Sequence, residues 1–160
     1  MHQPTGIVAS IRPVGRDGLA RVMPVMRDAF DPQFGEAWTE GQCLSLMLLP
    51  GVWLSLASDS KDEPLGFTLN RITLDEAELL LIGVRKDARG RGVGRQLLAE
   101  MMTTARERGA SQVFLEVRDG NPARKLYEAC GFVMVGRRRA YYTGADGQTF
   151  DALTFRRMLD

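Results

Sequence analysis

Apolar residues recur along the chain with two spacings, one typical of strands and the other of helices. Alternating or continuous apolar runs predict strands over residues 7–14, 52–58, 65–74, 77–84, 112–118, 132–138 and 150–159. Apolar residues three or four positions apart predict helices over residues 17–30, 39–49, 97–109 and 121–130. We expect the strand at 77–84 to be longer and more buried than the two strands before it. The order β-α-α-β-β-β-α-β-α-β-β predicts an α/β domain with a mixed, mostly antiparallel sheet and helices on both faces.

Capping residues predict where several of these helices begin. Thr39 and Gln42 have the T-x-x-Q spacing of a capping box, and Asn121 followed by proline is typical of a helix start. Asp17 is the expected cap of the first helix. Pro24 lies inside that helix and lacks a backbone N–H, so we expect it to kink or split the helix.

Length and composition are those of one globular domain. Of the 160 residues, 44% are hydrophobic and 26% are charged, which suffices for a sizeable core, and no linker or repeat divides residues 1–160. The formal net charge of +1 gives no strong overall attraction to nucleic acid or membrane. There is no run of 18 apolar residues, and the first residues lack the pattern of a signal peptide. We therefore expect a cytoplasmic protein that does not enter the membrane.

Cysteine and histidine usage excludes several kinds of site. Cys43 and Cys130 lie far apart without metal-type spacing, so we expect two reduced thiols. His2 is the only histidine, which excludes a Ser-His-Asp triad and a histidine-containing zinc cluster. We expect no metal site.

The stretch VRKDARGRGVGRQLL, from Val84 to Leu98, joins a predicted strand to a predicted helix through three glycines. Between residues 85 and 95 it carries five basic side chains and one acidic one, a local charge of 5 − 1 = +4. The glycines let backbone N–H groups converge, and a helix start adds the positive end of its dipole, so we expect this turn to bind phosphate. The P-loop and dinucleotide-binding motifs do not fit, because Arg95 stands where each needs another residue.

Residues 89–94, RGRGVG, fit the pattern R/Q-x-x-G-x-G/A, and with it the chain resembles the GNAT family of acetyltransferases. The segments DEAELLLIGV, FLEVRDGNPARKLYEACGF, GRRRAYY and AWT are similar to those of the RimI-type branch. The resemblance covers nearly the whole chain and implies acetyl-CoA as co-substrate, with its pyrophosphate in the turn and its pantetheine arm along the preceding strand. The residues that it assigns to acetyl-CoA are Ile82, Val84, Arg89, Gly90, Arg91, Gly92, Val93, Gly94, Arg95, Asn121 and Tyr127.

Glu116 is a carboxylate in an otherwise apolar strand, with its apolar neighbours on the opposite face. An unpaired buried carboxylate is costly, so one interpretation is a structural ion pair with Arg118 or Arg95. The resemblance implies instead that Glu116 is the general base of catalysis, with Glu78 on the earlier strand as the rival.

Tyr127 lies on the apolar face of the last predicted helix, where a buried aromatic is the simplest interpretation. The resemblance implies that it is the general acid that protonates the departing thiolate. The loop before it is one residue shorter than the usual family pattern, which leaves two roles open for Asn121: contact with the pantetheine arm, or capping of the helix.

The resemblance also implies an acceptor. It places Trp38, Glu78, Tyr141 and Tyr142 at a substrate groove and favours the N-terminal α-amine of a protein, in particular a ribosomal protein. An alternative is the acetylation of a small-molecule amine. Another is a non-catalytic acyl-CoA or RNA-binding module, since RRRAYY combines basic and aromatic residues. We expect no specific nucleic-acid partner, and a monomer or weak homodimer.

Overall fold

The computed structural model describes residues 5–160, so His2 lies outside the described residues. Within these residues seven strands form one sheet in the order β1-β2-β3-β4-β5-β7-β6, and all neighbours are antiparallel except β4 and β5. The strands are β1 (Ser10–Val14), β2 (Val52–Ser58), β3 (Pro64–Thr73), β4 (Glu76–Val84), β5 (Gln112–Arg118), β6 (Val133–Thr143) and β7 (Thr149–Met158). The α-helices are α1 (Leu19–Ala29), α2 (Glu40–Met47), α3 (Val93–Glu107) and α4 (Ala123–Ala129). The predicted α/β class, with its mixed and mostly antiparallel sheet, is confirmed.

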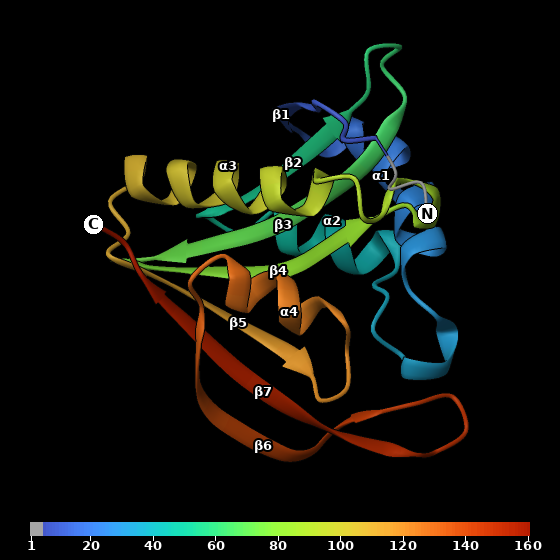
Figure 1. Ribbon diagram of the computed structural model, residues 1–160, viewed down its shortest axis with the longest axis vertical. Coiled ribbons are helices and arrows are strands. Elements are labelled where there is room, and N and C mark those ends of the chain that lie inside the picture. The colour runs from blue at the N-terminus through green and yellow to red at the C-terminus, as the bar shows by residue number, and fades with distance from the viewer. Residues whose placement is uncertain (1–4) are drawn as a thin grey trace.

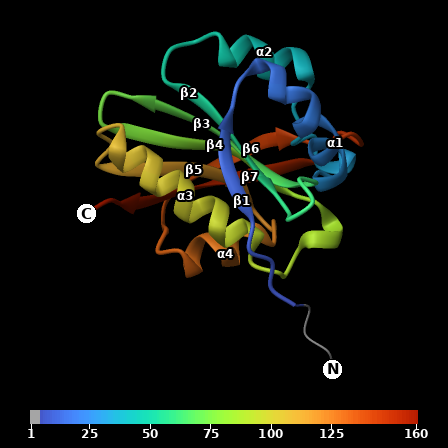
Figure 2. The same ribbon diagram turned by 90° about the horizontal axis from the view of Figure 1, so that it is seen from above.

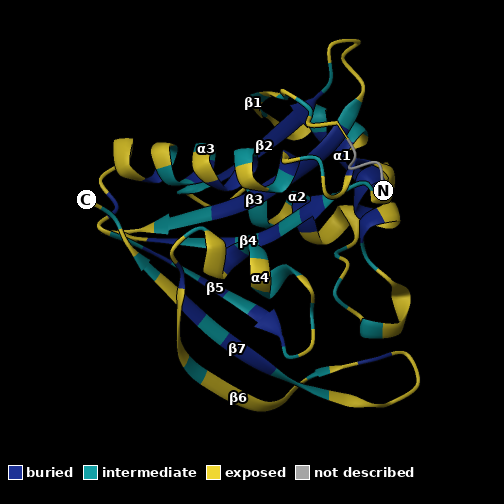
Figure 3. Cartoon of the chain, in the orientation of Figure 1, coloured by how far each residue is buried: buried dark blue, intermediate teal, exposed yellow. Residues whose placement is uncertain are grey.

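The helices form a layer on each side of the sheet. Figure 2 shows α3 and α4 on one side and α1 and α2 on the other. The main core cluster packs α3 and α4 against the sheet, and a second cluster packs α1 and α2 against its other face. Burial is deepest in β2 and β3 and alternates along β4, whereas β6 is an exposed edge strand (Figure 3). No helix in residues 5–160 is long and apolar enough to cross a membrane.

Two predictions about helix ends meet different outcomes. The capping box is confirmed: the Thr39 hydroxyl accepts from the Gln42 backbone N–H at 3.1 Å, and the Gln42 side chain accepts from the Thr39 backbone N–H at 2.8 Å. Asp17 is not a cap, because it lies in a short 3-10 turn and the residue before α1 is Gly18. Pro24 does not split α1; it lies on the exposed side of the helix, so the carbonyl that proline leaves unbonded is accessible to solvent.

The first strand is shorter than predicted, because residues 7–9 bind to the start of α3 instead of the sheet. The Ile7 backbone N–H donates to the Arg91 carbonyl at 2.9 Å. The Gln96 side chain donates to the Ile7 carbonyl at 2.6 Å and accepts from the Ala9 N–H at 2.9 Å. The N-terminal segment therefore braces the glycine-rich turn.

β4 and β5 separate after a short parallel pairing. They pair only between Glu76–Leu79 and residues 112–115, and a bulge at the Leu69/Asn70 step of β3 shifts the register of β4. Beyond that point the two strands diverge (Figure 1). The prediction that 77–84 is the longest and most buried of these strands is wrong: β3 is, because alternate β4 side chains face the opening and are only half-buried.

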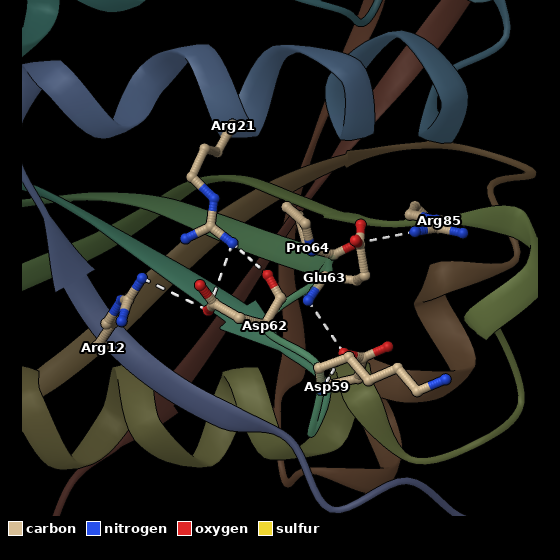
Figure 4. Close-up of polar contacts among 8 residues, drawn as sticks. Arg12, Arg21, Asp59, Asp62, Glu63, Pro64 and Arg85 are labelled. Atoms are coloured by element: carbon tan, nitrogen blue, oxygen red, sulfur yellow. Dashed lines mark hydrogen bonds and ion pairs between the residues drawn. The ribbon is translucent and has the colours of Figure 1, made fainter.

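The turn between β2 and β3 is held by arginines from elsewhere in the fold (Figure 4). Asp62 adopts a left-handed conformation, with φ 63°, and pairs with Arg12 and Arg21. Asp59 accepts the backbone N–H groups of residues 61 and 63. Arg85 reaches this region from the end of β4 and donates to the Pro64 carbonyl at 3.1 Å, so its guanidinium is directed to the β2–β3 turn.

Candidate active site

A cavity of about 1020 Å³ lies where β4 and β5 separate. It joins the glycine-rich turn at one end to the β6–β7 hairpin at the other. Of the residues that the sequence analysis placed in a site, all but Arg91 line it: Trp38, Glu78, Ile82, Val84, Arg89, Gly90, Gly92, Val93, Gly94, Arg95, Glu116, Asn121, Tyr127, Tyr141 and Tyr142.

The glycine-rich turn presents backbone to this cavity. Gly90 and Gly92 have φ values of 72° and 88°, in the left-handed region that L side chains rarely adopt. Gly92 is the N-cap of α3, and no side chain within residues 5–160 caps the helix there, so its first N–H groups can bind an anion. Gly94 allows close packing, because a Cβ there would lie 3.0 Å from Leu126 of α4. The turn therefore has the geometry of an anion site.

Three of the five basic side chains of this stretch, those of Lys86, Arg89 and Arg95, line the cavity. Arg85 is turned away and pairs with Asp87 at 2.6 Å. Arg91, which the resemblance assigns to acetyl-CoA, does not line the cavity, and its Nε donates to the Thr5 carbonyl at 2.8 Å.

Arg89 is anchored as well as exposed to the cavity. Its guanidinium donates to the Val84 and Ala29 carbonyls, which joins the turn to the ends of β4 and α1. The positive charge at the cavity is therefore smaller than the local sequence count of +4. The backbone N–H groups of the turn must then contribute a larger share of anion binding.

Glu116 lies on the face of β5 opposite to the core, as its strand pattern predicts. Its side chain is 23% exposed and pairs with Arg138 of β6 at 3.2 Å. The partner is thus neither Arg118 nor Arg95, because the β5–β7–β6 order places β6 within reach of this face. Glu78 pairs with Arg71 at 2.7 Å. Both candidate bases also line a smaller adjoining cavity of about 380 Å³.

Tyr127 is buried and lines the main cavity from α4. Its ring packs edge-on against Phe132, with centroids 6.1 Å apart. Burial raises the pKa of Tyr127, and the nearby Glu36 and Tyr142 raise it further. The phenol is therefore protonated at neutral pH, and it is a weaker acid than a free phenol.

The tyrosine pair of β6 closes the other end of the cavity. Tyr141 and Tyr142 stack edge to face, with ring centroids 5.1 Å apart. Burial raises the pKa of Tyr142, and the charge of Glu116 raises it further. Glu116 therefore lies near the Tyr142 phenol.

Sequence reasoning missed two charged residues of the site, Glu36 and Arg118. Both are largely buried and form an ion pair beside the cavity, and both line it. Arg118 was considered only as a partner of Glu116. The sequence could have indicated Arg118, because it is a charged residue at the end of a predicted buried strand. Glu36 lies in a loop whose sequence gives no sign of burial.

Asn121 takes the capping role. Its side-chain oxygen accepts from the Ala123 backbone N–H at 2.9 Å, and its amide donates to Glu36 at 3.3 Å. Both ends of the amide are therefore committed to protein groups.

Comparison with known proteins identifies this arrangement. A model of the GNAT acetyltransferase family matches residues 23–132, more than half of the chain. The chain belongs to the GNAT family. The match runs from α1 to the end of α4, so it includes the glycine-rich turn, Glu116 and Tyr127, and stops before the tyrosine pair.

Several relatives of this GNAT protein carry the name [ribosomal protein bS18]-alanine N-acetyltransferase. The one from Haemophilus influenzae is 36% identical over 95 residues, which are 59% of this chain and 65% of that protein. The one from Haemophilus ducreyi is 31% identical over 117 residues, which are 72% of this chain and 79% of that protein. The aligned part thus spans less than two thirds of the Haemophilus influenzae relative.

The fold similarity extends over almost the whole GNAT chain. The crystal structure of the ribosomal-protein-S18-alanine N-acetyltransferase from Escherichia coli superposes with a TM-score of 0.83 at 27% identity, over 96% of this chain and 95% of that one. The similarity therefore includes β6 and β7, which lie outside the family match. No group of histidine, cysteine and acidic side chains suited to a metal ion is found in the part of the chain that the structure describes.

Proposed function

We propose that this protein transfers the acetyl group of acetyl-CoA to the N-terminal α-amine of a protein, with a ribosomal protein as the acceptor. The observation that carries the proposal is one continuous cavity, with an anion-binding turn at one end and carboxylates and tyrosines at the other. Relatives named as bS18-alanine N-acetyltransferases support the class of acceptor.

In this proposal the donor end of the cavity holds acetyl-CoA. The N–H groups of the turn and the N-terminus of α3 bind the diphosphate, assisted by Lys86 and Arg95. The pantetheine arm lies along β4, since β5 pairs with β4 only as far as Leu79 and the backbone beyond is open to a ligand. Ile82 and Val84 supply its apolar contacts.

Transfer then needs a base and a proton donor. Glu116 accepts a proton from the α-ammonium group through a water molecule, and the amine attacks the thioester carbon. The C–N bond forms, the C–S bond breaks, and its electron pair leaves on sulfur. The attacking nitrogen releases its second proton through water, and this proton restores the Tyr127 phenol after it has protonated the thiolate. Because burial keeps the Tyr127 phenol protonated, it donates a hydrogen bond to the sulfur as negative charge develops there and supplies the proton of the released thiol.

An α-amine suits this arrangement better than a lysine. Its reference pKa of about 7.7–8.0 compares with about 10.4 for lysine, so deprotonation near neutral pH costs roughly 3–4 kcal/mol less. A single carboxylate acting through water is sufficient for such an amine.

Thiol release from acetyl-CoA tests the proposal. Peptides with Ala, Ser, Met or Gly at a free N-terminus are compared with the same peptides blocked at the N-terminus but containing lysine, and with free polyamines. We expect turnover with free N-termini and little with the other acceptors. Turnover with polyamines alone would identify a small-amine acetyltransferase, and acetyl-CoA binding without any turnover would identify a sensor.

Replacing Tyr127 with phenylalanine separates its chemical role from its packing role. We expect turnover to fall by on the order of 10²-fold with little change in the affinity for acetyl-CoA, because the lost hydrogen bond forms mainly as the thiolate leaves. The stability cost is at most about 0.5–1.5 kcal/mol, because the ring is kept. Steady-state kinetics and calorimetry measure the two effects.

An acyl donor with a more acidic thiol provides the control. Its leaving group needs a proton less, so it restores part of the activity of Tyr127→Phe. Near-normal turnover of the variant with acetyl-CoA would show that Tyr127 only packs in the core.

A further inference from the structure

Glu36 and Arg118 form a buried ion pair at the acceptor end of the cavity. Arg118 Nε donates to Glu36 Oε1, and the two side chains are only 8% and 13% exposed, for Arg118 and Glu36 respectively. Glu36 lies in the loop between α1 and α2, and Arg118 is the last residue of β5. The pair thus joins two segments that are 82 residues apart in the sequence.

Further contacts attach the same loop to the β6–β7 hairpin. The Arg118 guanidinium lies over the ring of Phe34 at 3.6 Å and near that of Phe150 at 5.5 Å. The two rings meet edge to face at 5.4 Å. The Gln33 carbonyl accepts from the Ala145 backbone N–H at 3.1 Å. The loop and the hairpin lie side by side in Figure 1.

We propose that Glu36 and Arg118 are positioning residues, which hold the loop of residues 31–38 in register with the two groups that act on the substrates. The inference rests on the proposed function, because it takes this loop as one wall of the acceptor entrance. Trp38, two residues after Glu36, lines the cavity. We refer to the ion pair of Glu36 and Arg118, together with Asn121, as the latch.

The latch reaches both expected catalytic residues through short connections. Arg118 follows Glu116 by two residues on the same face of β5. Asn121 donates to the second oxygen of Glu36 and caps the helix that carries Tyr127. One carboxylate therefore ties the acceptor loop to the strand of the base and to the helix of the proton donor.

Energetics favour a positioning role over simple stabilisation. Taking two charges out of water is costly, and apolar residues of similar size often stabilise a fold as well as a buried ion pair does. An ion pair differs from apolar packing in that the guanidinium holds the carboxylate in one orientation. The orientation of Asn121 is fixed by its cap to Ala123, so its amide must point at Glu36 and requires an acceptor there.

Glu36→Gln tests the latch, because it keeps the size of the side chain while it removes the charge and one acceptor. We expect KM for a peptide acceptor to rise roughly 10-fold, whereas Kd for acetyl-CoA stays within about twofold, because the glycine-rich turn is untouched. Glu128→Gln is the matched control. It removes an exposed ion pair with Arg124 on α4, outside the cavity, and should change neither constant.

Fluorescence gives a readout that is independent of activity. In a Trp53→Phe background, Trp38 is the remaining tryptophan. Trp53 is buried and its ring N–H has no partner within residues 5–160, so phenylalanine removes no hydrogen bond. We expect acrylamide quenching of Trp38 to increase roughly twofold in Glu36→Gln, because the loop opens more often. Arg118→Gln should act in the same way, and the double variant should add little to either single change.

The outcomes separate the latch from the proposed function. Unchanged peptide KM and unchanged quenching in folded Glu36→Gln would overturn the latch. Additive effects of the two substitutions would overturn it as well, since groups that act as one unit are not additive. If the wild-type protein acetylates no peptide, the proposed function fails, while quenching still decides whether the ion pair holds the loop.

Discussion

Glu116→Gln lowers the turnover of a peptide N-terminus by roughly 10²–10⁴-fold, and Kd for acetyl-CoA stays within about twofold. Glutamine keeps the shape and the contact with Arg138 but cannot accept a proton. The variant should also lose the rise in rate with pH that base catalysis produces. Turnover across a pH series, with calorimetry for the donor, measures both effects.

Stability is not expected to explain that loss. The ion pair of Glu116 is partly open to solvent, since the Arg138 side chain is 60% exposed, and such pairs contribute about 0–1 kcal/mol. Thermal unfolding of Glu116→Gln should therefore be close to that of the wild type.

Glu78→Gln is the comparison that assigns the base. Glu78 also lines the cavity and also pairs with an arginine, so it is matched to Glu116 in chemistry and setting. Burial raises the pKa of Tyr142, and the charge of Glu116 raises it further, so Glu116 lies near the phenol of this cavity-lining tyrosine. Glu78→Gln should cost less. If it costs more, the base lies on β4 and Glu116 is a structural partner of Arg138.

Local sequence patterns predicted most of the fold. The period of apolar residues predicted every strand and α-helix, because each face of the sheet buries one set of side chains. The capping box at Thr39 and Gln42 is also confirmed, because its two residues lie within one helical turn and need no distant partner. Asp17 does not cap α1, because the chain forms a short 3-10 turn before the helix, and Pro24 does not split the helix.

Features that depend on distant partners could not be predicted. Nothing local in β4 indicates that β5 leaves it after Leu79, yet this divergence makes the cavity. The same limit applies to Arg91, which binds the Thr5 carbonyl, and to Glu116, whose partner comes from β6. Residue type identified the ionisable groups, and only the sheet order decided which of them meet.

The glycine-rich turn was predictable because its function is carried by backbone geometry. Gly92→Val should weaken acetyl-CoA binding by roughly 10²–10⁴-fold from the micromolar affinity that we expect of the wild type, through loss of about two charge-assisted hydrogen bonds of about 1.5–3 kcal/mol each. Gly92 has φ 88°, where a β-branched residue is strained. A strain of roughly 1–2 kcal/mol is small beside the usual 5–15 kcal/mol of folding stability, so the protein folds while the turn rearranges. Calorimetry with acetyl-CoA measures the loss.

Gly109→Val is the matched control, because it imposes the same kind of strain away from the turn. Gly109 has φ 94°, with no atom of the described chain within 4 Å of an added Cβ, and it lies beyond the C-terminal end of α3. A helix of 15 residues is about 22 Å long, so this glycine is remote from the expected phosphate site. The control should unfold at a slightly lower temperature and bind acetyl-CoA normally. Equal loss of binding in both variants would assign the effect to general destabilisation, and normal binding by folded Gly92→Val would place the diphosphate elsewhere in the cavity.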